Sequence, residues 1–101
     1  MGPLKEAFLL AYDVGTSSLK GVVYARDGAL LASAASRYEN SFPQKDWAEA
    51  DPSKWWDALI EVSAVLKEEL PSFSAAQGIS FTGQMHTAVL LDERGQPLQP
   101  T

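Results

Sequence analysis

The sequence has 101 residues, enough for one small domain with a single core but too few for the two-lobed architecture that encloses most phosphoryl-transfer substrates. Apolar residues make up 46% and charged residues 21%, a balance typical of a folded chain and unlike that of a disordered one. The net charge of −5 offers no basic surface for nucleic acid, and the absence of cysteine excludes disulfides, a thiolate nucleophile and a Cys-based zinc site.

The N-terminal segment contains only a short apolar run before Asp13. This run is shorter than the roughly 7–15 apolar residues of a secretory signal and much shorter than a membrane span. We therefore expect a cytoplasmic protein that has neither a membrane nor a nucleic acid as a partner.

Three short runs of strand-forming residues follow one another along the first part of the chain. They predict strands over residues 7–14, 20–26 and 30–38. The stretch "RDGA" places an Asp-Gly pair, a strong hairpin signal, between the second and third strands. Because short connections join antiparallel neighbours, the three strands are predicted to form an antiparallel meander.

A helix is predicted over residues 51–70. Asp51 and Pro52 are typical of an N-cap and of the first helical position, and apolar residues then recur at helical spacing up to Pro71. The acidic Glu49 is expected to fix the loop that enters the helix. The apolar positions expected to face the core are Trp55, Trp56, Leu59, Ile60, Val62, Leu66 and Leu70.

The last third of the chain predicts two more short strands. "GISFTG" predicts a buried strand near residues 78–82, "AVLLD" a further strand, and "ERGQP" a turn. A strand that follows a crossover helix usually pairs in parallel with an earlier strand, so residues 78–82 are expected beside residues 7–14. The predicted fold class is therefore α/β, with a mixed sheet, a crossover helix and a parallel fourth strand.

The connection between the first two strands contains more chemistry than a turn requires. "DVGTSSLK", residues 13–20, joins an acid, a glycine, three consecutive hydroxyl residues and a lysine. Glycine lets the backbone approach a phosphate, hydroxyls and amides donate hydrogen bonds to its oxygens, and a carboxylate can hold Mg²⁺ through water. The pattern matches neither the P-loop nor the dinucleotide-binding motif, so phosphate would bind in a hairpin. Taken alone, the motif would more often be a polar turn whose acid caps backbone amides.

A second polar cluster, "GQMH", follows the predicted strand over residues 78–82. Loops at such strand ends are where open α/β sheets usually bind ligands. Gln84 and His86 can hydrogen-bond sugar hydroxyls, and Met85 supplies adaptable apolar surface. His86 is the only histidine, so no second His or Cys accompanies it to form a metal site, and a purely structural role is the alternative.

Three ordered blocks of the sequence resemble the N-terminal end of the FGGY family of carbohydrate kinases, whose nucleotide-binding domain belongs with those of actin, hexokinase and the Hsp70 ATPase. The blocks are "DVGTSSLKGVVYARDGALL", "WAEADPSKWWDAL" and "GISFTGQMHTAVLLDERGQPLQP". Their order and spacing are more specific than any single block. The resemblance implies an RNase H-like, actin-like fold and identifies residues 1–101 as the first part of the kinase N-terminal domain, truncated and without the C-terminal domain.

The resemblance also implies roles for individual residues. Asp13 matches the essential acid of the first phosphate motif, which positions Mg²⁺–ATP and would hold the metal ion through water. The substrate contacts are expected at Gln84, Met85 and His86. The cofactor-binding positions are expected at Gly15, Thr16, Ser17, Ser18 and Lys20.

The implied reaction is transfer of the γ-phosphoryl group of ATP to a sugar, a ketopentose such as D-xylulose or a related ketose or polyol. The xylulokinase branch is the nearest in appearance, but Thr87 stands where that branch usually has Gly, which leaves the identity of the sugar open. The catalytic base, an Asp, and the adenosine-binding domain lie downstream in the family, so this chain alone is expected to be inactive. The resemblance allows a homodimer.

Two alternatives come from other functional classes. One is a non-enzymatic nucleotide-binding switch of the actin and Hsp70 superfamily, against which "GQMH" counts because it suits a small polyol. The other is a plain interaction domain, which is favoured only if neither phosphate nor sugar binds.

Overall fold

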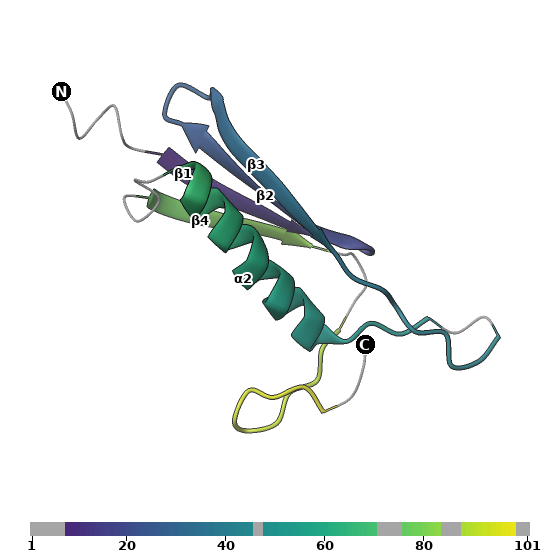
Figure 1. The fold of residues 1–101 in the computed structure, drawn as a ribbon. Helices are drawn as coiled ribbons and strands as arrows, with labels where there is room; N and C mark the ends of the chain where they lie inside the picture. The colour runs from purple at the N-terminus through teal and green to yellow at the C-terminus, as the bar shows by residue number, and fades with distance from the viewer. Residues whose placement is uncertain (1–7, 46–47, 71–75, 84–87, 99–101) are drawn as a thin grey trace.

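The computed structural model describes residues 8–45, 48–70, 76–83 and 88–98. It contains a four-stranded sheet and one long helix (Figure 1). The elements are β1 Phe8–Val14, β2 Ser18–Ala25, β3 Leu30–Arg37, α2 Pro52–Glu69 and β4 Ala76–Gly83. Each predicted strand of the meander and the predicted helix is therefore confirmed, with boundaries that differ by one or two residues.

The sheet has the strand order β3-β2-β1-β4. β1 pairs antiparallel with β2, and β2 pairs antiparallel with β3, whereas β1 and β4 run parallel. This arrangement confirms the predicted mixed sheet, including the parallel fourth strand. The parallel pairing matters for the site because it brings the carboxyl ends of β1 and β4 to the same edge of the sheet.

The turn between β2 and β3 contains the predicted Asp-Gly pair. Gly28 has a φ of 92°, a left-handed conformation that other residues rarely adopt. The N–H of Ala29 donates to the Asp27 carboxylate at 2.9 Å, and the N–H of Ala25 donates to the Ala29 carbonyl at 2.8 Å. These hydrogen bonds, all within residues 25–29, form the turn that joins β2 to β3.

The helix α2 begins at the predicted cap. The Asp51 carboxylate accepts hydrogen bonds from the Ser53 N–H at 2.9 Å and from the Ser53 hydroxyl at 2.7 Å, and Pro52 occupies the first helical position. These bonds hold the pKa of the Asp51 carboxyl below its usual value. Just upstream, the backbones of Ser41 and Glu49 pair at 2.8 Å in both directions, which closes the connection that leads into the helix.

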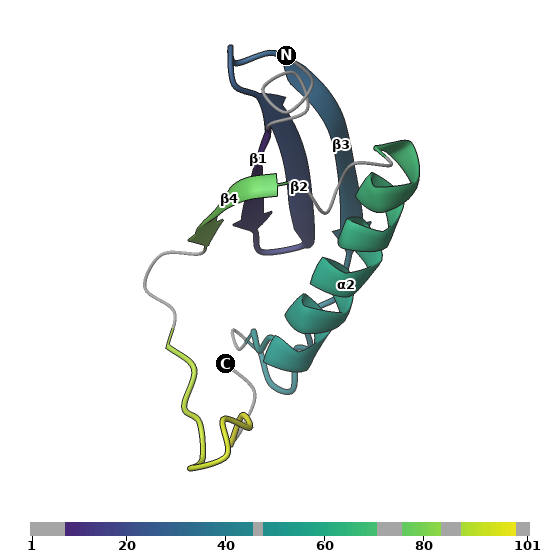
Figure 2. The same ribbon diagram turned by 90° about the vertical axis from the view of Figure 1, so that its left-hand side faces the viewer.

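The core lies between α2 and one face of the sheet. α2 crosses β2 and β3 and leaves β4 uncovered (Figure 2). Gly21 is buried directly beneath it, and a Cβ there would lie only 2.6 Å from Cγ1 of Val62, so glycine sets how closely the helix approaches β2. The buried apolar residues are Phe8, Leu10, Tyr12, Leu19, Val23, Ala32, Ala58, Val62 and Leu66.

The apolar face predicted for the helix was too wide. Ala58, Val62 and Leu66 form the buried stripe, whereas Trp56 is 63% exposed and Ile60 is 54% exposed. Leu59 and Leu70 pack against this row as partly buried residues, so that part of the prediction is confirmed, and Val62 and Leu66 lie closest to Gly21. Trp56 and Ile60 fall on the flanks of that row.

The strand predicted for "AVLLD" was also wrong. Residues 88–98 form an open hairpin in which Leu91 makes an isolated bridge with Pro97. The predicted "ERGQP" turn is confirmed: the Asp92 carboxylate accepts from the N–H groups of Arg94 and Gln96, and Gly95 has a φ of 81°. The turn forms from local hydrogen bonds, and within the described residues its arms do not join the four-stranded sheet.

Candidate functional site

The candidate phosphate-binding loop, residues 15–18, connects β1 to β2. It closes through a hydrogen bond from the Gly15 N–H to the Ser18 carbonyl at 2.9 Å. A Cβ on Gly15 would lie 3.0 Å from that carbonyl oxygen, so the tight turn favours glycine at this position. Ser18 is already the first residue of β2, which makes the loop shorter than the sequence predicted.

The outer side of this loop carries unused hydrogen-bond donors. Thr16 and Ser17 are both exposed. Within the described ranges, neither their hydroxyls nor their N–H groups take part in a hydrogen bond, although both carbonyls do. Two amides and two hydroxyls are therefore available to an anion or to water at the turn.

Asp13 lies beside the loop on the sheet face that α2 does not cover. Its neighbours in β1, Tyr12 and Val14, pack toward the core, so the alternation of the strand turns Asp13 to the other face. Its cross-strand partners are Lys20 on β2 and Thr82 on β4. The structure thus brings together Asp13 and Lys20, as the sequence predicted, and adds Thr82, which the sequence reasoning missed.

The second polar cluster begins next to this loop. Gly83 is the last residue of β4 and pairs with Val14, the last residue of β1. Gln84, Met85, His86 and Thr87 come next in the chain, and they lie outside the described residues, so their predicted roles stay predictions. The pairing of Gly83 with Val14 places Gly83 at the same sheet edge as the candidate phosphate-binding loop.

Two residues beyond β3 contact the loop from its inner side, and the sequence reasoning did not identify either. The Tyr38 hydroxyl donates to the carbonyls of Gly15 and Ser18, and the Asn40 side-chain amide donates to the Thr16 carbonyl at 3.1 Å. Burial, and then the nearby Asp13 carboxylate, raise the pKa of Tyr38 above its usual value. The hydroxyl therefore stays protonated and acts as a donor at neutral pH.

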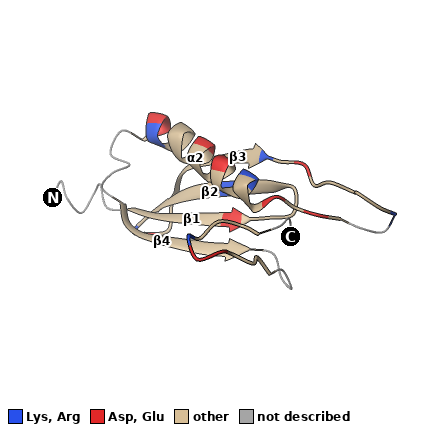
Figure 3. Cartoon of the chain, turned by 90° about the horizontal axis from the view of Figure 1, so that it is seen from below, with Lys and Arg blue, Asp and Glu red and all other residues tan. Residues whose placement is uncertain are grey.

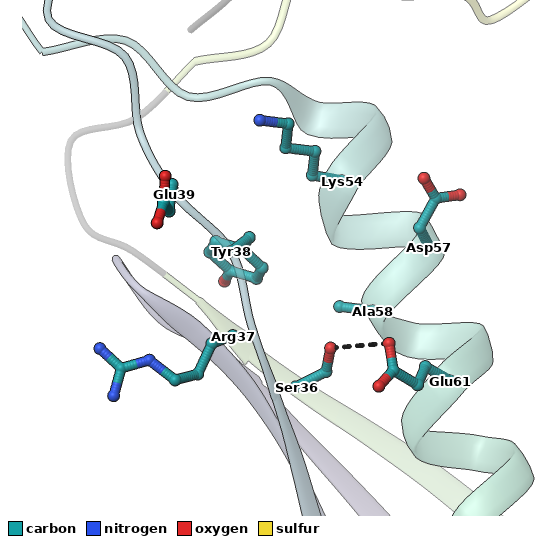
Figure 4. Close-up of a pocket in the computed structure, with 8 residues that line it drawn as sticks. All are labelled: Ser36, Arg37, Tyr38, Glu39, Lys54, Asp57, Ala58 and Glu61. Atoms are coloured by element: carbon teal, nitrogen blue, oxygen red, sulfur yellow. Dashed lines mark hydrogen bonds between the residues drawn. The ribbon is translucent and has the colours of Figure 1, made fainter.

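A separate open groove lies between the end of β3 and the first half of α2 (Figure 4). Ser36 points toward the helix and donates to the Glu61 carboxylate at 3.1 Å, whereas Arg37 points away from it. The groove shares only Tyr38 with the loop contacts. Its residues are Ser36, Arg37, Tyr38, Glu39, Lys54, Asp57, Ala58 and Glu61.

The residues around Asp13 suit a magnesium ion that arrives with a nucleotide. No group of three or more His, Asp or Glu side chains that could enclose a metal ion occurs in residues 8–45, 48–70, 76–83 and 88–98. Mg²⁺ in nucleotide sites usually keeps several waters and takes only one or two protein carboxylates together with phosphate oxygens. The single exposed carboxylate of Asp13 fits that second kind of site, with the ion held through water.

Charged residues are spread over the strands, helix and loops, and neither sign forms a continuous patch in this view (Figure 3). Because positive charge is not gathered on one surface, any anion at the candidate site would be held by local groups.

No helix in the described part of the chain is long and apolar enough to cross a membrane.

The chain is similar to several carbohydrate kinases. It is 37% identical over 94 residues to a xylulose kinase of Lactococcus lactis, covering 92% of this chain and 19% of that one. It is also 37% identical over 98 residues to a glycerol kinase of Koribacter versatilis, covering 94% and 20%. A kinase structure from Brucella ovis, described as a xyloylose kinase, superimposes with a TM-score of 0.88 at 34% identity, covering 92% and 20%.

The chain therefore spans about one fifth of the length of the relatives it matches. The model of the N-terminal domain of the FGGY carbohydrate kinases matches residues 8–101, nearly the whole chain. The mixed sheet and its helix agree with the same domain in the solved kinases. The shared fold and these similarities lead to one conclusion: the chain belongs to the FGGY family of carbohydrate kinases, and its residues 8–101 match the model of their N-terminal domain.

Proposed function

We propose that the complete polypeptide carrying these residues transfers the γ-phosphoryl group of ATP to a hydroxyl of a small sugar or polyol. Residues 1–101 would form the first part of its N-terminal domain. The observation that carries the proposal is the phosphate loop with Asp13 beside it. Exposed amide and hydroxyl donors of Thr16 and Ser17 meet an acid at the edge where β1 and β4 both end.

In this proposal the chain's own groups bind and orient the nucleotide. Thr16 and Ser17 donate to phosphate oxygens, with Gly15 and Ser18 shaping the turn, and Lys20 adds a positive charge on the same sheet face as Asp13. Asp13 would hold Mg²⁺ through water, and the ion would supply charge neutralisation for the phosphates.

The sugar would bind at the segment that follows β4. Gln84 and His86 supply hydrogen-bonding groups, and Met85 supplies apolar contact. The pairing of Gly83 with Val14 supports this placement, because it starts the segment beside the phosphate loop. Relatives of equal identity carry the names xylulose kinase and glycerol kinase, so we propose D-xylulose as the first substrate to test and glycerol as its main competitor.

The direct test measures ATP-dependent phosphorylation by the full-length protein with D-xylulose, other ketoses and glycerol. Asp13→Asn should lower kcat on the order of 10²–10³-fold with little change in the sugar KM. The reason is that a carboxylate that positions Mg²⁺ stabilises mainly the charge that develops in the transition state. Asp27→Asn is the matched control: the same chemical change in an exposed turn at the other end of β2 should leave kcat unchanged. A near-wild-type kcat for Asp13→Asn would reduce Asp13 to a turn residue.

The sugar site has its own test. His86→Ala should weaken sugar binding about two- to tenfold and leave the ATP KM nearly unchanged, since one buried hydrogen bond is lost. Thr87→Gly should change the ranking of D-xylulose against other ketoses and polyols if the Thr87 side chain borders the pocket. An equal change for all substrates would assign Thr87 to packing only.

A further inference from the structure

The inner side of the phosphate loop is fully occupied by hydrogen bonds. The carbonyl of every residue from 15 to 18 accepts at least one hydrogen bond from another described residue. The Gly15 and Ser18 carbonyls accept from the Tyr38 hydroxyl, and the Ser18 carbonyl also accepts from the Gly15 N–H at 2.9 Å. The Thr16 carbonyl accepts from the Asn40 amide at 3.1 Å, and the Ser17 carbonyl from the Tyr38 N–H at 3.1 Å. Tyr38 and Asn40, which follow β3 directly, therefore hold the backbone of residues 15–18 in place.

The planarity of the peptide bond means that these contacts also set the orientation of two N–H groups on the other side of the loop. In a planar trans peptide the C=O and the following N–H point in opposite directions. A Gly15 carbonyl directed at Tyr38 therefore turns the Thr16 N–H away from Tyr38, and a Thr16 carbonyl directed at Asn40 turns the Ser17 N–H away from Asn40. These are the two loop amides that make no hydrogen bond within the described residues.

Both donors are themselves held in place. The Tyr38 ring packs against the core, and the N–H of Tyr38 extends the pairing of β2 with β3 by one step. Asn40 precedes the reciprocal backbone bonds of Ser41 and Glu49. The Asn40 Oδ1 atom is buried and has no partner among the described residues, whereas the NH₂ group of the same side chain donates to the Thr16 carbonyl.

We propose that Tyr38 and Asn40 are positioning residues of the phosphate site, which orient the loop amides toward the nucleotide without touching it. The inference rests on the proposed function, since it assigns these residues to nucleotide binding. A loop held in the binding geometry before the ligand arrives loses less conformational freedom on binding. Removing either donor should therefore weaken Mg²⁺–ATP binding and leave the sugar unaffected.

The experiment uses full-length Tyr38→Phe and Asn40→Ala. Tyr38→Phe keeps the packed ring and removes only the hydroxyl, and Asn40→Ala provides a second variant at a half-buried loop position should the first fold poorly. Each should raise the KM for Mg²⁺–ATP about two- to tenfold, the range expected for one lost hydrogen bond, with the sugar KM unchanged. Amide hydrogen exchange of residues 15–18 in the absence of ligand should become faster in both.

The matched control is Tyr12→Phe. It removes a tyrosine hydroxyl that hydrogen-bonds Ser63 at 2.7 Å in the core, away from the loop. This variant should lose stability to urea but keep the wild-type KM for ATP. It therefore separates a general loss of stability from a local loss of loop orientation.

The outcomes separate the inference from the function on which it rests. A wild-type protein that fails to bind Mg²⁺–ATP overturns the proposed function, and the inference with it, before any variant is compared. A wild-type protein that binds ATP together with Tyr38→Phe and Asn40→Ala variants that bind it equally well overturns the inference alone. Equal increases in the ATP and sugar KM values would also overturn it, because they would show a structural role.

Discussion

The two faces of the sheet differ in what they hold. The face under α2 contains the buried side chains and Gly21, where the helix comes closest to β2. The opposite face carries Asp13 and Lys20 at one end and exposed apolar residues, including Leu30, at the other. The residues that hold the fold together and the residues of the candidate site therefore lie on opposite faces of one sheet, so substitutions on one face should leave the other nearly unaffected.

The largest expected effect on stability comes from the covered face. Leu66→Ala should lower the free energy of unfolding by about 2–5 kcal/mol, because Leu66 is fully buried and the helix and sheet can close the cavity only partly. Urea unfolding measures this loss. Val65→Ala, one residue along on an exposed side of the same helix, is the control and should cost much less. Similar losses for both would mean that α2 does not pack as described.

Gly21→Ala should cost about 1–3 kcal/mol through overpacking. The added methyl group would lie 2.6 Å from Cγ1 of Val62, so the helix would have to move. The double variant Gly21→Ala with Val62→Ala should lose less than the sum of the two single changes, which a double-mutant cycle measures. Simple additivity would contradict a direct contact. Gly83→Ala is a mild comparison, because its Cβ would meet only ordinary contacts with Val14 at 3.8 and 3.9 Å.

The N-cap of α2 should contribute a smaller amount. Asp51→Ala should lower the free energy of unfolding by about 0.5–2 kcal/mol, since the Ser53 N–H loses its acceptor. The pKa of Asp51 is lower in the folded chain than in the unfolded one, so its contribution is complete at neutral pH and is lost as the pH falls below about 4.

Asp51→Asn is the matched control for this pH dependence. Asparagine caps a helix as well as aspartate does but does not titrate. The variant should therefore keep most of the stability at pH 7 and lose the part of the acid sensitivity that Asp51 supplies. Unchanged acid sensitivity in thermal or urea unfolding between pH 7 and pH 3 would assign it to other carboxylates.

The smallest effect is expected on the open face. Leu30→Ser should change the free energy of unfolding of the 101-residue chain by no more than about 0.5 kcal/mol, because Leu30 is more than half exposed and lies outside the core. Equilibrium unfolding in urea measures it. A loss above about 1 kcal/mol would show that this face is covered in solution, and the separation of the two faces would fail.

Much of the fold could be predicted because its signals are local. The Asp27-Gly28 turn and the Asp51 cap each depend on residues a few positions apart, and the structure contains both. The parallel pairing of β1 with β4 followed from the crossover helix. The exposure of Trp56 could not be predicted, because the side of the helix that packs on the sheet depends on Gly21, a residue in a different element that Val62 and Leu66 approach closely.

The candidate site was predicted from two segments, residues 13–20 and 84–86, and the structure adds groups from the end of β3 and from β4. The acid and the hydroxyl residues of the loop were identifiable from their sequence spacing. Tyr38, Asn40 and Thr82 were not, because only the pairing of β2 with β3 and of β1 with β4 brings them to the loop. The sequence offered one indication for Tyr38 and Asn40: they lie at the end of a predicted strand, just before a polar connection.

The position of β1 between β2 and β4 also has a consequence for how the chain is made. β2 leaves the ribosome directly after β1 and can pair with it at once, whereas β4 follows only after α2 has been synthesised. At translation rates of roughly 5–20 residues per second, one side of β1 waits for several seconds with its backbone groups unpaired. Such an edge attracts other strands, so the nascent chain passes through an interval in which chaperones are most useful. The emergence of β4 closes that edge and, in the same step, brings Thr82 beside Asp13.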